Sequence, residues 1–173
     1  MVNFVQRTKK KSINWPSLKW VFADIHRCLA FGCGSGWLKP ASGTWGTVFG
    51  ALISVPFVEY LPVWLQIVVL VLAYGYGIYI CQRVSQELGV HDHGGIVWDE
   101  IVAIAFVYAL MPLQNIWFFI LGFLFFRIFD VIKPFPIRQI DAKLHSGQAI
   151  MLDDLLAGIY TLIVLYLIKY FCL

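Results

Sequence analysis

IVWDEIVAIAFVYALMPLQNIWFFILGFLFFRIFDV, residues 96–131, joins two apolar runs whose acidic side chains stand only at the outer ends. Asp99 and Glu100 open the first run, Asp130 closes the second, and Met111–Pro112 divides the two. Proline followed by a polar residue is typical of a tight turn between helices. The stretch therefore predicts a helical hairpin with both acidic ends on the same side.

The composition places this hairpin in a membrane. The chain has 173 residues, of which 60% are hydrophobic and 13% charged, far from soluble usage. Its apolar stretches are about as long as a helix that crosses a bilayer, and they lie at 45–60, 62–81, 96–113, 115–131 and 154–172. Spans this apolar should be helical because lipid leaves no partner for backbone groups, and the alternation of barrel strands is missing. We expect an all-α polytopic membrane bundle of about four to five apolar helices, forming one domain over residues 1–173.

Charges fall on one side of this predicted topology. Alternating spans put residues 1–44, 82–95 and 131–153 together. With residues at the span ends assigned to the nearer side, this side receives all but Lys169 of the 13 Lys and Arg residues. It also receives all but Glu59 of the 10 acids, and all 4 histidines. The basic excess indicates the cytoplasmic side of a bacterial inner membrane. Membrane topology thus explains the net charge of +3, which does not indicate a nucleic-acid partner.

The cytoplasmic N-terminal segment, residues 1–44, contains a second kind of element. Residues 17–31 mix apolar side chains with Lys19, Asp24, His26 and Arg27. Such a mixture predicts an amphipathic helix that lies along the membrane surface.

The acids at the span ends are the strongest functional signal. Ionisable residues at the edge of hydrocarbon are costly and usually face a bundle interior. Five close negative charges would repel unless a hard cation such as Mg²⁺ neutralised them. The alternative is that they cap helices or pair with Arg127 and Lys133. The candidate metal ligands are Asp99, Glu100, Asp130, Asp153 and Asp154.

Cations and histidines accompany the acids. Arg127, Asp130 and Lys133 follow one another at i, i+3 and i+6, which keeps them on one side of a helix. With Arg138 they suit a phosphate substrate, whose oxygens bind Arg and Lys. His91 and His93 precede Asp99–Glu100 in a glycine-loosened loop, and either could be the general acid for a leaving alkoxide.

Glycine-rich turns precede the first apolar stretch, at 32–36 and 40–47. Turns before a helix can present backbone N–H groups to an anion, so Ser35 and Thr44 are candidate substrate-binding residues. Gly46 and Gly50 form a GxxxG pattern, which favours close helix packing over ligand binding.

These motifs together resemble the phosphatidylglycerophosphatase A family over nearly the full chain. The matching segments are GSG at 34–36, SGTWGT at 42–47, HDHGGIVWDE at 91–100, FRIFDVIKPFPI at 126–137 and MLDDLLAG at 151–158. Ser42 and Thr47 depart from the family, which usually has proline and serine there. The resemblance implies packed helices, removal of the terminal phosphate of phosphatidylglycerophosphate to give phosphatidylglycerol, and a divalent cation, normally Mg²⁺.

The expected chemistry joins these parts. Asp99, Asp130 and Lys133 would be catalytic together with His91 or His93, while Mg²⁺ would activate an attacking water. A covalent aspartyl-phosphate is the other route, and the sequence leaves both routes and the oligomeric state open. The rival function is a small membrane transporter or ion-binding protein, which predicts acids near mid-span or on both sides.

Overall fold

The computed structural model describes residues 15–90, 93–135, 137, 139 and 146–172, and the regular elements within them are all helical. This confirms the predicted all-α class. The elements in chain order are α1 (Leu18–Phe22), α2 (Ile25–Ala30), the 3₁₀ helix η1 (Gly32–Trp37), α3 (Ser42–Tyr60), α4 (Val63–Leu88), α5 (Trp98–Leu110), α6 (Ile116–Ile132) and α8 (Gly147–Cys172).

The turns fall where the sequence places its prolines. Pro62 precedes the first residue of α4. The α5 helix ends just before Met111–Pro112, and α6 begins after Asn115, whose side chain accepts a hydrogen bond from the backbone N–H of Phe118 at 3.0 Å. An asparagine cap of this kind satisfies a backbone donor that the helix leaves unpaired. The predicted hairpin turn at Met111–Pro112 is therefore present, and Pro62 stands at the turn between α3 and α4.

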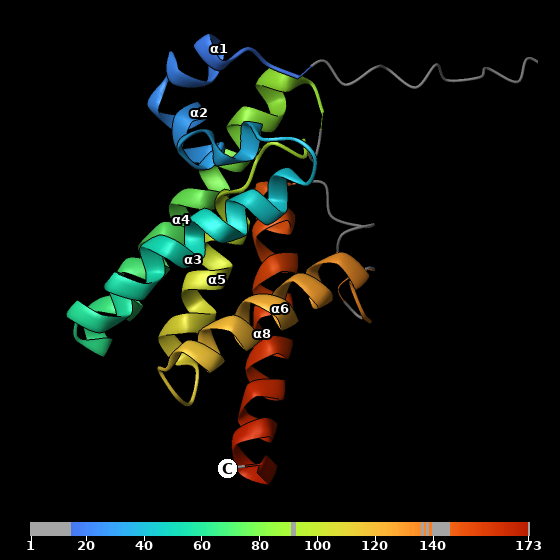
Figure 1. Ribbon diagram of the computed structural model, residues 1–173. Helices are drawn as coiled ribbons and strands as arrows, with labels where there is room; N and C mark the ends of the chain where they lie inside the picture. Colours follow the sequence, from blue (N-terminus) through green and yellow to red (C-terminus); the bar gives the residue numbers. More distant parts are fainter. Residues whose placement is uncertain (1–14, 91–92, 136, 138, 140–145, 173) are drawn as a thin grey trace, which may run out of the picture.

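The short helix α5 organises the core, because it packs against α3, α4, α6 and α8 (Figure 1). Small residues allow the closest approach. A Cβ added to Gly50 of α3 would lie 2.8 Å from the Cα of Ile101, and one added to Gly46 would lie 2.5 Å from the Cβ of Val97. The predicted GxxxG packing contact is thus present. It sets the N-terminal end of α3 beside that of α5, where Asp99 and Glu100 lie.

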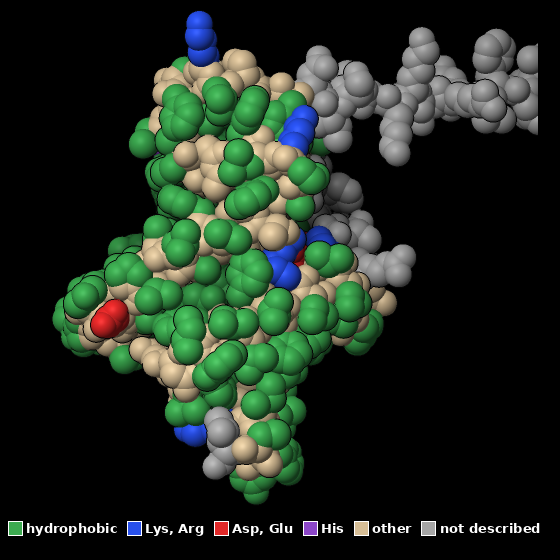
Figure 2. All heavy atoms as spheres, viewed as in Figure 1, with side chains coloured by type: hydrophobic (Ala, Val, Ile, Leu, Met, Phe, Trp, Pro, Cys, Tyr) green, Lys and Arg blue, Asp and Glu red, His purple; other side chains and the backbone are tan. Residues whose placement is uncertain are grey.

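Two helices could cross a bilayer by length and composition. The α4 and α8 helices have 26 residues each, with a mean hydropathy of 1.9 in their most apolar windows. Only 17% and 22% of these windows are buried, unlike a helix in a soluble core. In Figure 2, hydrophobic side chains cover most of the visible face. The expected count of four to five spanning helices is not confirmed, since the 13 residues of α5 reach only about 20 Å at 1.5 Å per residue.

The prediction of a single amphipathic helix at 17–31 is wrong in the number of helices. The segment forms two short helices, because Asp24 adopts an extended backbone and its side chain accepts hydrogen bonds from the backbone N–H groups of His26 and Arg27. Asp24 also pairs with Arg83 of α4 at 3.0 Å. Desolvation opposes ionisation of Asp24, but the two backbone hydrogen bonds and Arg83 outweigh it and lower its pKa. This acid therefore ends one helix, starts the next and fixes both to α4.

Candidate active site

A cavity of about 200 Å³ opens where four helices meet. Its wall is formed by the N-terminal ends of α3 and α5, the C-terminal end of α6 and the second turn of α8. All five predicted acids line it, together with one cation: Asp99, Glu100, Asp130, Asp153, Asp154 and Lys133. The structure thus brings the predicted metal ligands together from three helices.

Three of these acids form a tight cluster. One carboxylate oxygen from each of Asp99, Glu100 and Asp154 lies within 4.8 Å of the other two. Among the described residues, Asp99 Oδ1, Glu100 Oε2 and Asp154 Oδ2 are buried and have no hydrogen-bond partner. Buried carboxylates are stable only when paired or when they coordinate a metal. The cluster is therefore a possible metal-binding site.

The other two acids pair with cations. Lys133 Nζ donates to Asp153 Oδ2 at 2.6 Å, and Arg127 donates to a carboxylate oxygen of Asp130. The alternative that acids pair with Arg127 and Lys133 therefore holds for Asp130 and Asp153. It does not extend to the cluster of Asp99, Glu100 and Asp154.

The alternative that the acids cap helices fails for α8. We expected Asp153–Asp154 to open the last helix, whereas α8 begins at Gly147, so the pair lies inside the helix. The earlier start is stabilised by Gln82 of α4, whose Oε1 accepts a hydrogen bond from the Gly147 N–H at 2.6 Å. In α5 the cap position is Val97, whose side chain makes no capping hydrogen bond.

The N-terminal end of α3 forms another part of the cavity wall. Ser42 and Gly43 line it, and no side chain caps this helix end among the described residues. A Cβ added to Gly43 would lie 2.4 Å from Glu100 Oε1, so a larger residue here would displace the Glu100 carboxylate. Uncapped N–H groups at a helix start attract anions. The sequence interpretation located this loop but did not single out Ser42 or Gly43.

Thr47 is a further contact that the sequence did not reveal. Its Oγ1 donates to the Gly43 carbonyl at 2.8 Å and accepts a hydrogen bond from Arg127 Nη1 at 3.3 Å. The residue lies one helical turn after Gly43, on the same side of α3. The spacing of Gly43 and Thr47 is visible in the sequence, but the partner on α6 is not.

Two of the predicted substrate-binding residues lie elsewhere. Among the described residues, the cavity lining includes neither Thr44, half-buried in the first turn of α3, nor Ser35 of η1. Arg138 lies outside the described residues. Arg127 and Lys133 are the predicted cations that the structure places at the acids.

His93 lies in an aromatic environment rather than in the cavity lining. The side chain is fully buried, with ring centroids 4.7 Å from Trp15 and 5.9 Å from Phe31. Its Nδ1 accepts the Gly95 N–H at 3.1 Å. The next residue, Gly94, does line the cavity, and its carbonyl accepts a hydrogen bond from the Ser42 hydroxyl. His93 therefore stabilises the loop that forms the rim, and His91 lies outside the described residues.

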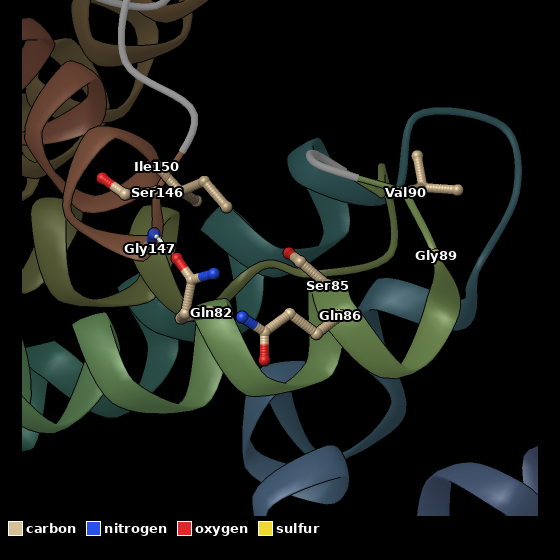
Figure 3. A pocket seen from close by; sticks show the side chains of 8 residues that line it. All are labelled: Gln82, Ser85, Gln86, Gly89, Val90, Ser146, Gly147 and Ile150. Atoms are coloured by element: carbon tan, nitrogen blue, oxygen red, sulfur yellow. Dashed lines mark hydrogen bonds between the residues drawn. The ribbon is translucent and has the colours of Figure 1, made fainter.

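A second cavity, of about 210 Å³, lies between the C-terminal end of α4 and the start of α8. Figure 3 shows Gln82, Ser85 and Gln86 of α4 facing Ser146 and Gly147. Its lining contains no ionisable side chain among the described residues. It offers nothing to hold a metal or to balance a phosphate, so the acidic cavity is the candidate active site.

Comparison with known proteins identifies the family of this chain. A family model for phosphatidylglycerophosphatase A matches residues 28–169. A Haemophilus influenzae protein of that name is 44% identical over 145 residues, which are 84% of this chain and 89% of that protein. An Escherichia coli protein of the same name is 38% identical over 143 residues, 81% of each chain. No solved structure matches. The match covers every helix of the acidic cavity, and the chain belongs to the phosphatidylglycerophosphatase A family.

Proposed function

We propose that the acidic cavity is the active site at which this enzyme removes the terminal phosphate of phosphatidylglycerophosphate. The products are phosphatidylglycerol and inorganic phosphate, and the cofactor is Mg²⁺. The reaction class follows from family membership, which identifies a phosphoric monoester hydrolase and excludes the transporter alternative. The observation that carries the site assignment is the cluster of Asp99, Glu100 and Asp154 inside a cavity that Lys133 also lines.

The donor set suits a hard divalent cation. Mg²⁺ prefers oxygen ligands and is usually held by a few carboxylates together with substrate phosphate oxygens. The three unbonded oxygens of the cluster fit this requirement. An ion bound there supplies Lewis acidity toward the phosphoryl oxygens and toward an attacking water. We assign the metal to these three acids rather than to all five, because Asp130 and Asp153 already pair with Arg127 and Lys133.

The remaining groups of the cavity bind and orient the phosphate. On the α6 side, Lys133 lines the cavity and Arg127 adds positive charge beside it through its pair with Asp130, while the uncapped start of α3 offers backbone N–H groups on the other side. Donors fixed before substrate arrives stabilise the charge on a transferring phosphoryl group without reorganisation. Asp130 and Thr47 both hold the Arg127 guanidinium, so we assign them the role of positioning this cation.

Asp153 and His93 also act through other residues in this proposal. The Asp153 carboxylate holds Lys133 Nζ at 2.6 Å. His93 supports the backbone of the loop at Gly94 and Gly95. Neither is assigned direct contact with the phosphate.

The membrane setting supports a lipid substrate. Apolar surface on α4 and α8 suits the bilayer, and we propose that α3, α5 and α6 are embedded beside them. The excess of Lys and Arg on the side of the cavity supports a cytoplasmic orientation in the inner membrane. In that arrangement the headgroup reaches the acids while the acyl chains stay in the leaflet.

The test is phosphate release from phosphatidylglycerophosphate by the purified protein in mixed micelles. We expect release with Mg²⁺, none with EDTA, and recovery when excess Mg²⁺ is added back. Asp99→Asn should be inactive, whereas Glu59→Gln, which removes an exposed acid at the far end of α3, should keep wild-type activity. Turnover in EDTA, or full activity of Asp99→Asn, would contradict the proposal.

A further inference from the structure

We infer that one acyl chain of the lipid substrate binds in an apolar groove between α3 and α6 while its phosphate occupies the acidic cavity. The inference rests on the proposed function and adds a second subsite to it. The groove encloses about 330 Å³ and is lined by α3 from Val48 to Val55 and by α6 from Ile116 to Leu124. On the face drawn in Figure 2, hydrophobic side chains cover both helices.

The base of the groove is closed by α5. Tyr108 lines it, is 3% exposed, and donates its hydroxyl hydrogen to the Phe119 carbonyl at 2.9 Å. The only polar group of this side chain is therefore satisfied, and the aromatic ring completes an apolar trough. A cavity lined in this way holds a hydrocarbon chain and excludes a charged headgroup.

The groove begins where the acidic cavity ends. The same two helices supply both sites: α3 lines the cavity with Ser42 and Gly43, and α6 lines it with Asp130. Between the two sites, Arg127 Nη1 donates to Thr47 Oγ1 at 3.3 Å and joins the helices. One residue beyond Thr47 on α3, and three residues before Arg127 on α6, the lining becomes apolar at Val48 and Leu124. A lipid bound with its phosphate among the acids would place its glycerol at this junction.

The length of the groove matches an acyl chain. From Thr47 to Val55 the α3 helix rises about 12 Å, and from Arg127 to Ile116 the α6 helix rises about 16 Å. Half of a bilayer's hydrocarbon core is about 15 Å deep. A chain entering at the cavity therefore has apolar contacts to about the middle of the membrane.

Another apolar cavity, of about 170 Å³, lies on the opposite side of α3 and is the rival subsite. It is cut off from the acids by two contacts. Trp98 Nε1 donates to the Ala73 carbonyl at 3.1 Å, which ties the start of α5 to α4. At Gly46 and Gly50 the α3 backbone packs directly on α5. The contact between the α3–α6 groove and the acids is instead the hydrogen bond from Arg127, a proposed phosphate-binding cation, to Thr47, so we assign the chain to this groove.

The experiment compares two substrates in the full-length protein: phosphatidylglycerophosphate with two long acyl chains, and its analogue with two six-carbon chains. Ala51→Phe and Leu52→Trp place bulk in the groove from two adjacent α3 positions. Leu72→Trp is the matched control, because Leu72 of α4 is 66% exposed, as Leu52 is 69% exposed, and it lies outside the groove lining.

We expect each groove variant to lower kcat/KM for the long-chain substrate about tenfold, because the added side chain displaces roughly two methylene groups of the acyl chain from the groove. Each variant should retain turnover of the short-chain analogue. Retained short-chain turnover also shows that the variant is folded. Equal losses on both substrates, no loss on the long-chain substrate, or an equal effect of Leu72→Trp would overturn the groove assignment. A wild-type protein that hydrolyses neither substrate would overturn the proposed function, and the groove assignment with it.

Discussion

Asp154→Asn should make the metal-free protein more stable and weaken its binding of Mg²⁺. The three clustered carboxylates have oxygens within 4.8 Å of one another. Two unit charges at that separation repel by about 3.5 kcal/mol at an effective dielectric constant of about 20. The Asp154 carboxylate faces two such neighbours, and asparagine keeps its shape while removing the charge. Proton uptake by the clustered acids, relaxation and solvent penetration relieve part of the repulsion, so we expect a net stabilisation of about 1–3 kcal/mol.

The assay is thermal unfolding in detergent, followed by tryptophan fluorescence, with EDTA and with increasing Mg²⁺. For a chain of this size, about 2–4 °C of Tm corresponds to each kcal/mol. In EDTA the Asp154→Asn Tm should exceed the wild-type Tm, and the same Mg²⁺ concentration should raise the wild-type Tm more than that of the variant, since stabilisation by a ligand falls as its Kd rises.

The exposed Glu59 provides the control, because Glu59→Gln removes one acid far from the cavity. It should leave both the Tm in EDTA and the response to Mg²⁺ unchanged. If Asp154→Asn lowered the Tm in EDTA, or if it kept the Mg²⁺ response, the assignment of the cluster as a metal site would be refuted.

Three further changes test other parts of the structure. Lys133→Met should raise KM for the lipid about tenfold or more, since a charge-assisted hydrogen bond contributes about 1.5–3 kcal/mol. Steady-state kinetics measures this KM, and an unchanged value would contradict the assigned role of Lys133. Gly43→Ala should lower kcat by about tenfold or more, because its Cβ would lie 2.4 Å from Glu100 Oε1 and displacements of about 1 Å are costly in an active site. The control Gly75→Ala, with no heavy atom within 4 Å of the new Cβ, should keep activity and gain about 0.5–1 kcal/mol of stability, so equal kcat losses would argue against the Gly43 contact. Finally, Asp24 has a folded-state pKa below its ordinary value of 3.8, so its stabilisation is present at neutral pH and is lost as the pH falls through that folded-state value. Asp24→Asn should therefore lower the Tm at pH 7 but not at strongly acidic pH, and a pH-independent difference would contradict this.

The convergence of the acids could be predicted because it depends only on helix order. Asp99 lies at the start of the first helix of the hairpin and Asp130 near the end of the second, with the proline turn between them. Any fold that keeps the hairpin therefore brings the two acids to the same side. The GxxxG contact of α3 was predictable for a similar reason, since small residues one turn apart mark a close helix approach.

The different partners of the five acids could not be predicted from the sequence. Asp153 and Asp154 are neighbours in sequence, yet Asp153 pairs with Lys133 while Asp154 joins Asp99 and Glu100. Successive helical residues point about 100° apart, so their partners depend on how α8 is rotated against α5 and α6. That rotation is set by packing along the whole helix, including its start at Gly147.

The surroundings of His93 and the helix break at Asp24 depend on contacts between segments that are distant in the sequence. A histidine beside acids is a natural candidate for proton transfer, but the aromatic rings of Trp15 and Phe31 enclose His93. The break at Asp24 depends on its capping hydrogen bonds and on Arg83, which lies far along the chain. Both outcomes are decided by tertiary contacts rather than by composition.

The most direct test compares Asp153→Asn with Asp154→Asn, two neighbouring acids with different assigned roles. The measurement is the Mg²⁺ concentration that gives half-maximal phosphate release from phosphatidylglycerophosphate. We predict that Asp154→Asn raises it at least about tenfold, because the ion loses a carboxylate ligand. Asp153→Asn should leave it near the wild-type value while raising KM for the lipid, because this carboxylate holds Lys133 Nζ. An equal shift in both variants, or phosphate release that needs no Mg²⁺, would contradict a metal centre built from Asp99, Glu100 and Asp154.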